Sequence, residues 1–381
     1  MNGIWYYFYA FVIVWILAMA FRDKLENHNF EVSFPVIMWR TKRLRGFIDN
    51  IANSVPRFWK WYYNIGIIVS FLAMIFISYT LIDSLQTITT TPSVSIILPG
   101  VEMPGSTIYV PFVYGFLALI TVLVVHEFSH GVASRLDKLS IKSIGLLLVA
   151  IIPGAFVEPD EDDLLKSSRL TRLRVYCAGS VANISLAAIA IICTVLISSF
   201  VVPAVFYDDG IEISRVVTDS PCDGILKEGM VIRSINNESC DSAVEYSSIV
   251  SSFKPNETVV VTTDSGQYNV KLGSNPNNAS VGYMGVQAAY HYKVNDYYSG
   301  IFGDKIPAVI FMFLEFLKWV FILNLGIGLF NLLPIKPLDG GHMLEILLSY
   351  RLPEEIYRPI VKATSYIMVL IIFISLFYSF F

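Results

Sequence analysis

Two histidines flank a glutamate within five residues of the sequence, His126-Glu127-Phe128-Ser129-His130. On a helix, residues four apart lie on one face, so both imidazoles can bind a single cation. Zn²⁺ accepts two histidine nitrogens and a carboxylate and keeps a fourth position for water, whose pKa then falls to about 7. Glu127 is placed to take a proton from that water. The pattern predicts a hydrolytic zinc site, and the alternative is an ordinary polar helix end.

Two histidines leave the predicted zinc ion one protein ligand short. The segment 331–342 (NLLPIKPLDGGH) follows a later apolar stretch and contains two candidates, Asp339 and His342. Pro334 and Pro337 would break a helix there and let a carboxylate turn inward. We expect Asp339 to be the third ligand. His342 is the rival ligand, and an ordinary turn is the alternative.

The composition indicates which environment must position these residues. Hydrophobic residues make up 55% of the 381 residues and charged residues only 15%, with a mean hydropathy of +0.60. Globular chains carry roughly 45–50% apolar and about 25% charged residues. Part of the surface must therefore face lipid, and disordered, collagen-like and disulfide-rich classes are excluded. The net charge of −4 gives no reason to expect nucleic acid as a partner.

Six apolar stretches are long enough to cross a bilayer core about 30 Å thick. They cover residues 4–21, 62–82, 107–131, 171–203, 306–333 and 359–381. The first stretch has no basic segment before it and no small-residue cleavage site, so we interpret it as a retained helix. The sequence thus predicts an α-helical polytopic membrane protein with about six spans.

The lysines and arginines of the connecting loops predict the orientation of these spans. Loops 22–61 and 135–174 are rich in basic residues, whereas loop 83–106 has none. Both loops are expected to be cytoplasmic, with both termini and segment 204–305 outside. Residues 107–125 supply 19 apolar positions before His126, about 28 Å of helix. The active site is therefore expected near the cytoplasmic leaflet, where Asp339 reaches a similar depth.

Two further segments differ from the predicted spans. Residues 140–157 are apolar but short and interrupted by Gly and Pro, which predicts a re-entrant or strand-like element covered by protein. Segment 204–305 is polar, and its runs 257–263 and 267–272 are separated by Asp-Ser-Gly, which is typical of a hairpin. At this length the segment can bury a core of its own.

The motifs together resemble the site-2 protease family of intramembrane zinc metalloproteases (peptidase M50-like). The resemblance rests on HEFSHG, NLLPIKPLDGGH and a PDZ-like insert between them, and it covers roughly 107–345. It implies that His126, His130 and Asp339 bind Zn²⁺ and that Glu127 is catalytic. The family motif G-P-x-x-N appears as Gly-Ser-Val-Ala-Asn ending at Asn183. The resemblance implies that Asn183 is a polar donor near the active site, and helix packing is the alternative.

The resemblance also implies a domain organisation. Residues 1–106 form an N-terminal two-span region, 107–203 the first part of the catalytic core, 204–300 an extracellular PDZ-like domain, and 301–381 the second part of the core. Met230 and Asn237 depart from the PDZ pattern. The PDZ-like domain is expected either to bind a peptide by β-augmentation or to plug access to the site.

The expected function is hydrolysis of peptide bonds within or near transmembrane segments of membrane protein substrates, in the lipid bilayer. Segment 140–157 is the candidate edge that holds the substrate extended. The alternatives are a membrane metal transporter and a catalytically idle membrane adaptor. Two cysteines in the outer segment, Cys222 and Cys240, are expected either to stay free or to form a disulfide.

Overall fold

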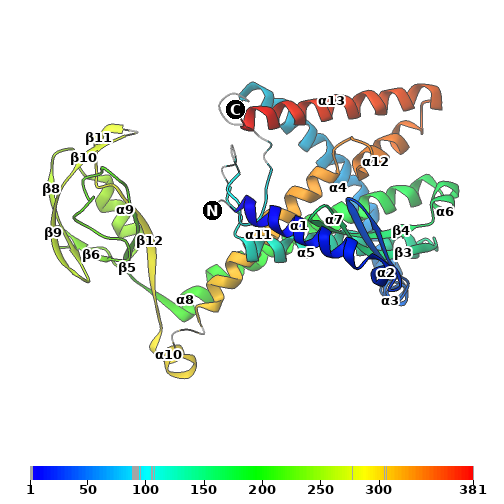
Figure 1. Ribbon diagram of the computed structural model, residues 1–381. Coiled ribbons are helices and arrows are strands. Elements are labelled where there is room, and N and C mark those ends of the chain that lie inside the picture. Colours follow the sequence, from blue (N-terminus) through cyan, green and yellow to red (C-terminus); the bar gives the residue numbers. More distant parts are fainter. Residues whose placement is uncertain are drawn as a thin grey trace. The chain divides into compact units, whose positions relative to one another are not determined.

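The computed structural model describes residues 3–87, 94, 96–103, 106, 108–276, 278–303, 305 and 307–380. The chain divides into two compact units (Figure 1). The first unit comprises residues 1–194 and 314–381, and the second comprises residues 195–313. The metal-site motifs all belong to the first unit.

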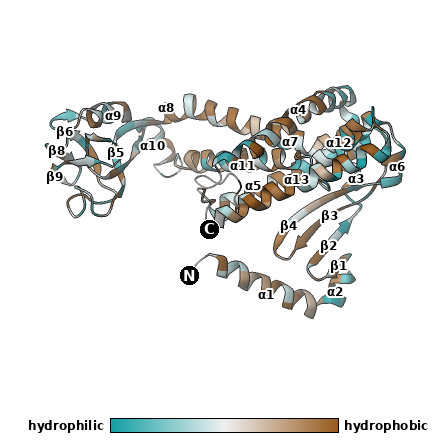
Figure 2. Cartoon of the chain, turned by 90° about the horizontal axis from the view of Figure 1, so that it is seen from above, coloured by the Kyte–Doolittle hydropathy of each residue, from teal (hydrophilic) through white to brown (hydrophobic). Residues whose placement is uncertain are grey.

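Five helices in the described part of the chain are long and apolar enough to cross a membrane. They are α4 (Pro56–Asp83), α5 (Phe112–Leu136), α7 (Arg169–Leu196), α11 (Val309–Asn331) and α13 (Glu354–Phe380). Apolar residues dominate these helices (Figure 2). A multi-pass membrane protein is therefore confirmed, and five of the six predicted spans correspond to long apolar helices.

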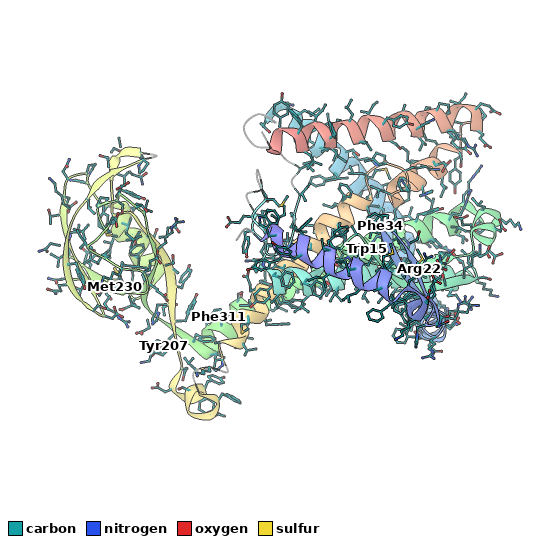
Figure 3. The ribbon with its side chains drawn as sticks, viewed as in Figure 1. Trp15, Arg22, Phe34, Tyr207, Met230 and Phe311 are labelled. Carbon is teal, nitrogen blue, oxygen red and sulfur yellow. The ribbon has the colours of Figure 1, made fainter. Side chains whose placement is uncertain are left out.

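The first predicted span corresponds to α1 (Ile4–Ala20), which has 17 residues. At 1.5 Å per residue it is about 25 Å long, slightly less than the bilayer core. Its residue Trp15 packs against Phe34, with ring centroids 5.0 Å apart (Figure 3). The Trp15 indole also donates a hydrogen bond to the Ala150 carbonyl at 2.8 Å. The count of six spans remains a prediction.

Segment 140–157 forms strands. β3 (Ile141–Val149) and β4 (Ile152–Pro159) make a hairpin, and β1 (Phe30–Ser33) and β2 (Val36–Thr41) extend it into an antiparallel sheet of order β1-β2-β3-β4. The sequence predicts a loop for residues 22–61, and β1 and β2 within it are not expected. β2 pairs with β3, which lies over a hundred residues away in the chain, so no local pattern indicates the strand. β4 is an outer strand, and one of its edges is not used by the sheet.

Short helices and a buried apolar cluster position the sheet against the helices. α2 (Arg22–Glu26) and α3 (Arg45–Ser54) flank β1 and β2, and α6 (Glu161–Lys166) follows β4. Ile48 of α3, Val132 of α5 and Val157 of β4 belong to one buried cluster. The end of β4 is thereby held against α5, which carries the two histidines of the predicted site.

The second unit is rich in β-strands. A main sheet has the order β12-β5-β6-β8-β9, with β7 paired to β6, and a smaller sheet pairs β10 with β11. The strands are β5 (Phe206–Val216), β6 (Val231–Ile235), β7 (Glu238–Ser239), β8 (Thr258–Thr263), β9 (Gly266–Lys271), β10 (Gly273–Asn275), β11 (Asn278–Tyr283) and β12 (Val286–Val294). The hairpin predicted at 257–272 is confirmed as β8 and β9, which pair antiparallel.

Helices complete this unit. They are α8 (Val202–Val205), α9 (Ala243–Ser251) and α10 (Asp296–Phe302), and a short π-helical turn, Ile197–Val201, precedes α8. The unit buries a core of its own, including Ile213, Ile232 and Val259.

Cys222 and Cys240 are free thiols in that core. The alternative in which they form a disulfide is therefore wrong, and the alternative of two free thiols holds. Burial raises the pKa of the Cys222 thiol to about 12 and that of Cys240 to about 11. Neither thiol ionises near neutral pH, so both behave as small buried apolar groups.

Candidate metal centre

Three ligand atoms converge in the first unit. The Nε2 atoms of His126 and His130 are 3.1 Å apart, and Asp339 Oδ2 lies 3.5 Å from each of them. The histidines are one turn apart on α5, and Asp339 is the first residue of α12 (Asp339–Leu348). Only 12–14% of each side chain is exposed. The structure thus brings together the three residues predicted to bind metal.

The spacing of these atoms fits a tetrahedral zinc ion. Ligands about 2.0–2.2 Å from a tetrahedral centre are separated from one another by roughly 3.3–3.6 Å. The two separations to Asp339, 3.5 Å each, lie in that range, and the 3.1 Å between the imidazole nitrogens lies within about 0.2 Å of it. Two imidazole nitrogens and one carboxylate oxygen are also the donor set of catalytic zinc sites, in which a fourth position stays open for water. His126, His130 and Asp339 therefore fit a catalytic zinc ion.

Gly179 of α7 keeps the space beside the two imidazoles free. A Cβ atom added there would lie 2.5 Å from Nε2 of both His126 and His130. Real Cβ contacts are essentially never that short. The close approach of α7 to α5 at this point therefore requires glycine, a role that sequence reasoning missed.

A carbonyl fixes the tautomer of His130. Its Nδ1 lies 2.7 Å from the Val175 carbonyl oxygen of α7, which accepts a hydrogen bond. Nδ1 must therefore carry the hydrogen, and the lone pair of Nε2 faces Asp339 and the space for the metal.

An amide does the same for His126. The Asn183 side chain lies 3.2 Å from His126 Nδ1, with its Nδ2 assigned to the contact. Its Oδ1 is buried and has no partner among the described residues. Exchanging the amide oxygen and nitrogen, which are nearly indistinguishable by shape, lets Oδ1 accept a hydrogen bond from Nδ1–H and leaves the lone pair of Nε2 free for a metal. The structure thus places Asn183 against a ligand of the site.

The carboxylate of Glu127 joins α5 to the sheet. Its Oε2 accepts a hydrogen bond of 2.9 Å from the backbone N–H of Val157 in β4. The predicted catalytic base is therefore anchored at the outer strand of the sheet, next to the two histidines.

The turn before α12 positions Asp339. Gly340 and Gly341 approach the backbone of Leu332 and Ile335 so closely that a Cβ on either would overlap it. Asp339 Oδ2 also accepts a hydrogen bond of 3.4 Å from the Ser180 hydroxyl. Serine replaces the family's proline at position 180, and the structure gives this departure a contact with the ligand carboxylate. The sequence alone contained no signal for it.

His342 points elsewhere. Its ring stacks on Tyr176 of α7 with centroids 4.5 Å apart and the planes inclined by 3°. Among the described residues, the group able to hold a metal consists of His126, His130 and Asp339. The geometry thus favours Asp339 over its rival.

The predicted helical depth of His126 is wrong. α5 begins at Phe112, so fourteen helical positions precede His126, about 21 Å rather than 28 Å. Residues 108–111 are not helical. Pro111, directly before the helix, has φ −59° and ψ 139°, and a proline disfavours the helical conformation of the residue before it. His126 therefore lies less deep from the start of its helix than predicted.

Known proteins provide an independent comparison. The family model of peptidase family M50 matches residues 114–375. An uncharacterized protein from Methanocaldococcus jannaschii is 24% identical over 87% of this chain and 82% of its own length. A membrane-bound transcription factor site-2 protease homolog from Arabidopsis thaliana is 28% identical over 32% of this chain and 24% of its own.

Among solved structures, this chain is similar to the PDZ domain of the SdrC-like protein from Listeria monocytogenes. The match covers 21% of this chain and 88% of the length of that structure, at 23% identity and a TM-score of 0.20. That score is too low to support an argument, so the PDZ-like assignment remains a prediction. The M50 model covers more than half of the chain and includes all the site motifs. The chain belongs to peptidase family M50, the family of the site-2 proteases.

Proposed function

We propose that this protein is an intramembrane zinc endopeptidase that hydrolyses peptide bonds within or near transmembrane segments of membrane proteins. The observation that carries the proposal is the convergence of His126, His130 and Asp339, with Glu127 bonded to the adjacent outer strand. Membership of peptidase family M50 supports the same reaction class.

The three ligands would hold Zn²⁺, which when bound polarises a carbonyl and lowers the pKa of water. Glu127 accepts the proton of the attacking water and then delivers it to the leaving amine. The Val157 N–H holds the Glu127 carboxylate in place for both steps. Val175 and Asn183 keep the imidazoles oriented, and Ser180 orients the Asp339 carboxylate.

The outer edge of β4 is the proposed substrate cradle. The Val157 N–H bonds to Glu127, so it points away from β3. Alternate residues of a strand share that direction, so the N–H and C=O of Ala155 and the C=O of Pro153 also face the outer edge. An extended substrate segment can add to this edge by β-augmentation, which would bring one of its carbonyls close to Glu127. A helical substrate must unwind locally to do so.

We place the active site near the cytoplasmic leaflet and the PDZ-like domain, residues 204–300, outside with both termini. The Lys/Arg distribution of the loops supports this orientation. The PDZ-like domain either binds a peptide of the substrate or limits access to the site.

A Glu127→Gln variant tests the reaction. Glutamine has the same shape and can still accept the Val157 hydrogen bond, but it cannot take a proton from water. General base catalysis contributes roughly 10²–10⁴-fold, so cleavage of candidate single-span proteins in detergent should fall by about that factor while zinc content stays unchanged.

The matched control is Glu315→Gln, which changes an α11 carboxylate that pairs with Lys318 and should leave cleavage intact. Retained cleavage in Glu127→Gln would refute the assignment. The two alternatives give other results. If the protein is an idle adaptor, neither wild type nor Glu127→Gln cleaves any substrate. If it is a transporter, wild type moves zinc into liposomes without cleaving any substrate.

A further inference from the structure

A basic cavity lies between α12 and α13, outside the metal centre. It has a volume of about 450 Å³, and its lining includes Lys336, Glu345, Arg358, Lys362, Ser365 and Tyr366. A second cavity of about 400 Å³ shares Lys336, Glu345 and Arg358 with it and adds Glu161 and Arg172. The two cavities therefore adjoin along these three shared side chains.

The charges of this double cavity do not balance. Four cationic side chains, Arg172, Lys336, Arg358 and Lys362, face only two carboxylates, Glu161 and Glu345. Lys336 pairs with Glu345, and Arg358 pairs with the exposed Glu354. With Glu354 counted, four cations stand against three carboxylates, and an anionic ligand would neutralise the remaining positive charge.

Two of the cations lack a carboxylate partner. No ion pair within the described residues engages Lys362, whose ammonium lies 5.8 Å from the centre of the Tyr366 ring. The Nε of Arg172 is buried and has no hydrogen-bond partner in the described part of the chain. Buried N–H groups are normally satisfied, so this donor indicates an acceptor that the protein itself does not supply.

The surface next to the cavity changes from charged to apolar along one helix face. Arg358, Lys362, Tyr366, Leu370 and Phe373 follow one another at three- or four-residue spacing, so they lie on the same side of α13. Tyr366, Leu370 and Phe373 are exposed, large and aromatic or apolar. The first turns of α13 carry Glu354 and Glu355 as well as Arg358 and Lys362. Since α13 is a candidate span, these charged turns would lie at the membrane boundary and the apolar stripe in the bilayer core.

This order of groups matches that of a phospholipid, with a charged phosphate followed by a hydrocarbon chain. Basic pockets between transmembrane helices bind anionic head groups. We propose that the cavity between α12 and α13 binds the head group of an anionic phospholipid, whose acyl chain lies along Tyr366, Leu370 and Phe373. A soluble phosphate would use the cations but would leave the adjoining apolar stripe without a role.

Native mass spectrometry of the full-length protein in detergent tests this proposal, with titrations of phosphatidylglycerol and of phosphatidylcholine. Wild type should bind at least one phosphatidylglycerol in preference to phosphatidylcholine. In the double variant Arg358→Gln/Lys362→Gln, affinity for this lipid should fall roughly 25-fold, because each surface cation contributes about fivefold toward anionic lipid.

The matched control is Arg57→Gln/Lys166→Gln, which removes one arginine and one lysine that are exposed and line neither cavity. It should bind phosphatidylglycerol like wild type, and Lys362→Arg should too. Zinc content and unfolding temperature in uncharged detergent show whether each variant is folded.

Several results would overturn the proposal. They are equal phosphatidylglycerol binding by the Arg358/Lys362 double variant and wild type, equal loss in the control, or displacement of the lipid by millimolar inorganic phosphate alone. Because the measurement does not involve proteolysis, its failure would leave the proposed enzymatic function untouched.

Discussion

Replacing Gly179 by alanine tests the geometry of the metal centre. The new methyl carbon would lie 2.5 Å from the Nε2 atoms of His126 and His130 and 2.6 Å from Cδ2 of His126. Non-bonded carbon contacts are optimal at about 3.5–4.0 Å. Each ring would have to move by roughly 1 Å, or α7 would have to move away from α5.

Either movement disturbs the spacing on which metal binding depends. The ligand atoms are now 3.1–3.5 Å apart, and a zinc site tolerates only a few tenths of an ångström in its bond lengths. Changes in the groups that merely orient zinc ligands cost about 10–100-fold in affinity. Because this methyl group displaces two ligands directly, we expect at least the upper value, about 100-fold or 2.8 kcal/mol.

Competition with a chromophoric chelator measures the affinity, and elemental analysis gives the zinc content per chain. The matched control is Gly326→Ala in α11, where an added Cβ meets nothing within 4 Å. The control should keep wild-type affinity and unfolding temperature. If Gly179→Ala also binds zinc within threefold of wild type, α5 and α7 do not approach each other at Gly179 as closely as the structure places them.

Three further predictions concern the third metal ligand, the two cysteines and one ion pair of the second unit. Asp339→Ala should lower bound zinc well below one per chain, whereas His342→Ala should not. If elemental analysis shows the reverse, His342 and not Asp339 is the third ligand. The two cysteines of the second unit should react with iodoacetamide only after unfolding, and a mass change on reduction alone would contradict their assignment as free thiols. The hydrogen bond from Arg233 holds the pKa of Asp209 below its usual value, so this pair stabilises the second unit fully above about pH 4 and loses its effect as pH falls further. Asp209→Asn should remove that part of the acid dependence in a urea titration, and an unchanged dependence would exclude the pair as its source.

Much of the molecule was predictable because it depends on local periodicity and composition. Helical spacing alone puts His126 and His130 on one face, and apolar length alone predicts five of the long helices. The Asp264-Ser265-Gly266 turn similarly predicts the β8–β9 hairpin. Each of these features is contained within one continuous segment, so it can be read without knowing what the segment contacts.

Tertiary structure decided the features that join distant segments. β2 pairs with β3, so that Val36 faces Val149, and no local pattern predicts which strand a loop segment will find. The choice between Asp339 and His342 depends on which one the turn before α12 directs toward α5, since the two residues are neighbours in sequence.

The supporting contacts of the site belong to the same class. Glu127 meets the Val157 N–H, and Ser180 meets Asp339, because helix packing brings them within hydrogen-bond distance. The sequence by itself thus determined the family, the histidine pair and the membrane location. Packing alone decided how a third ligand, a base and their hydrogen-bond partners are assembled around one point, because the separations between those segments depend on the whole fold.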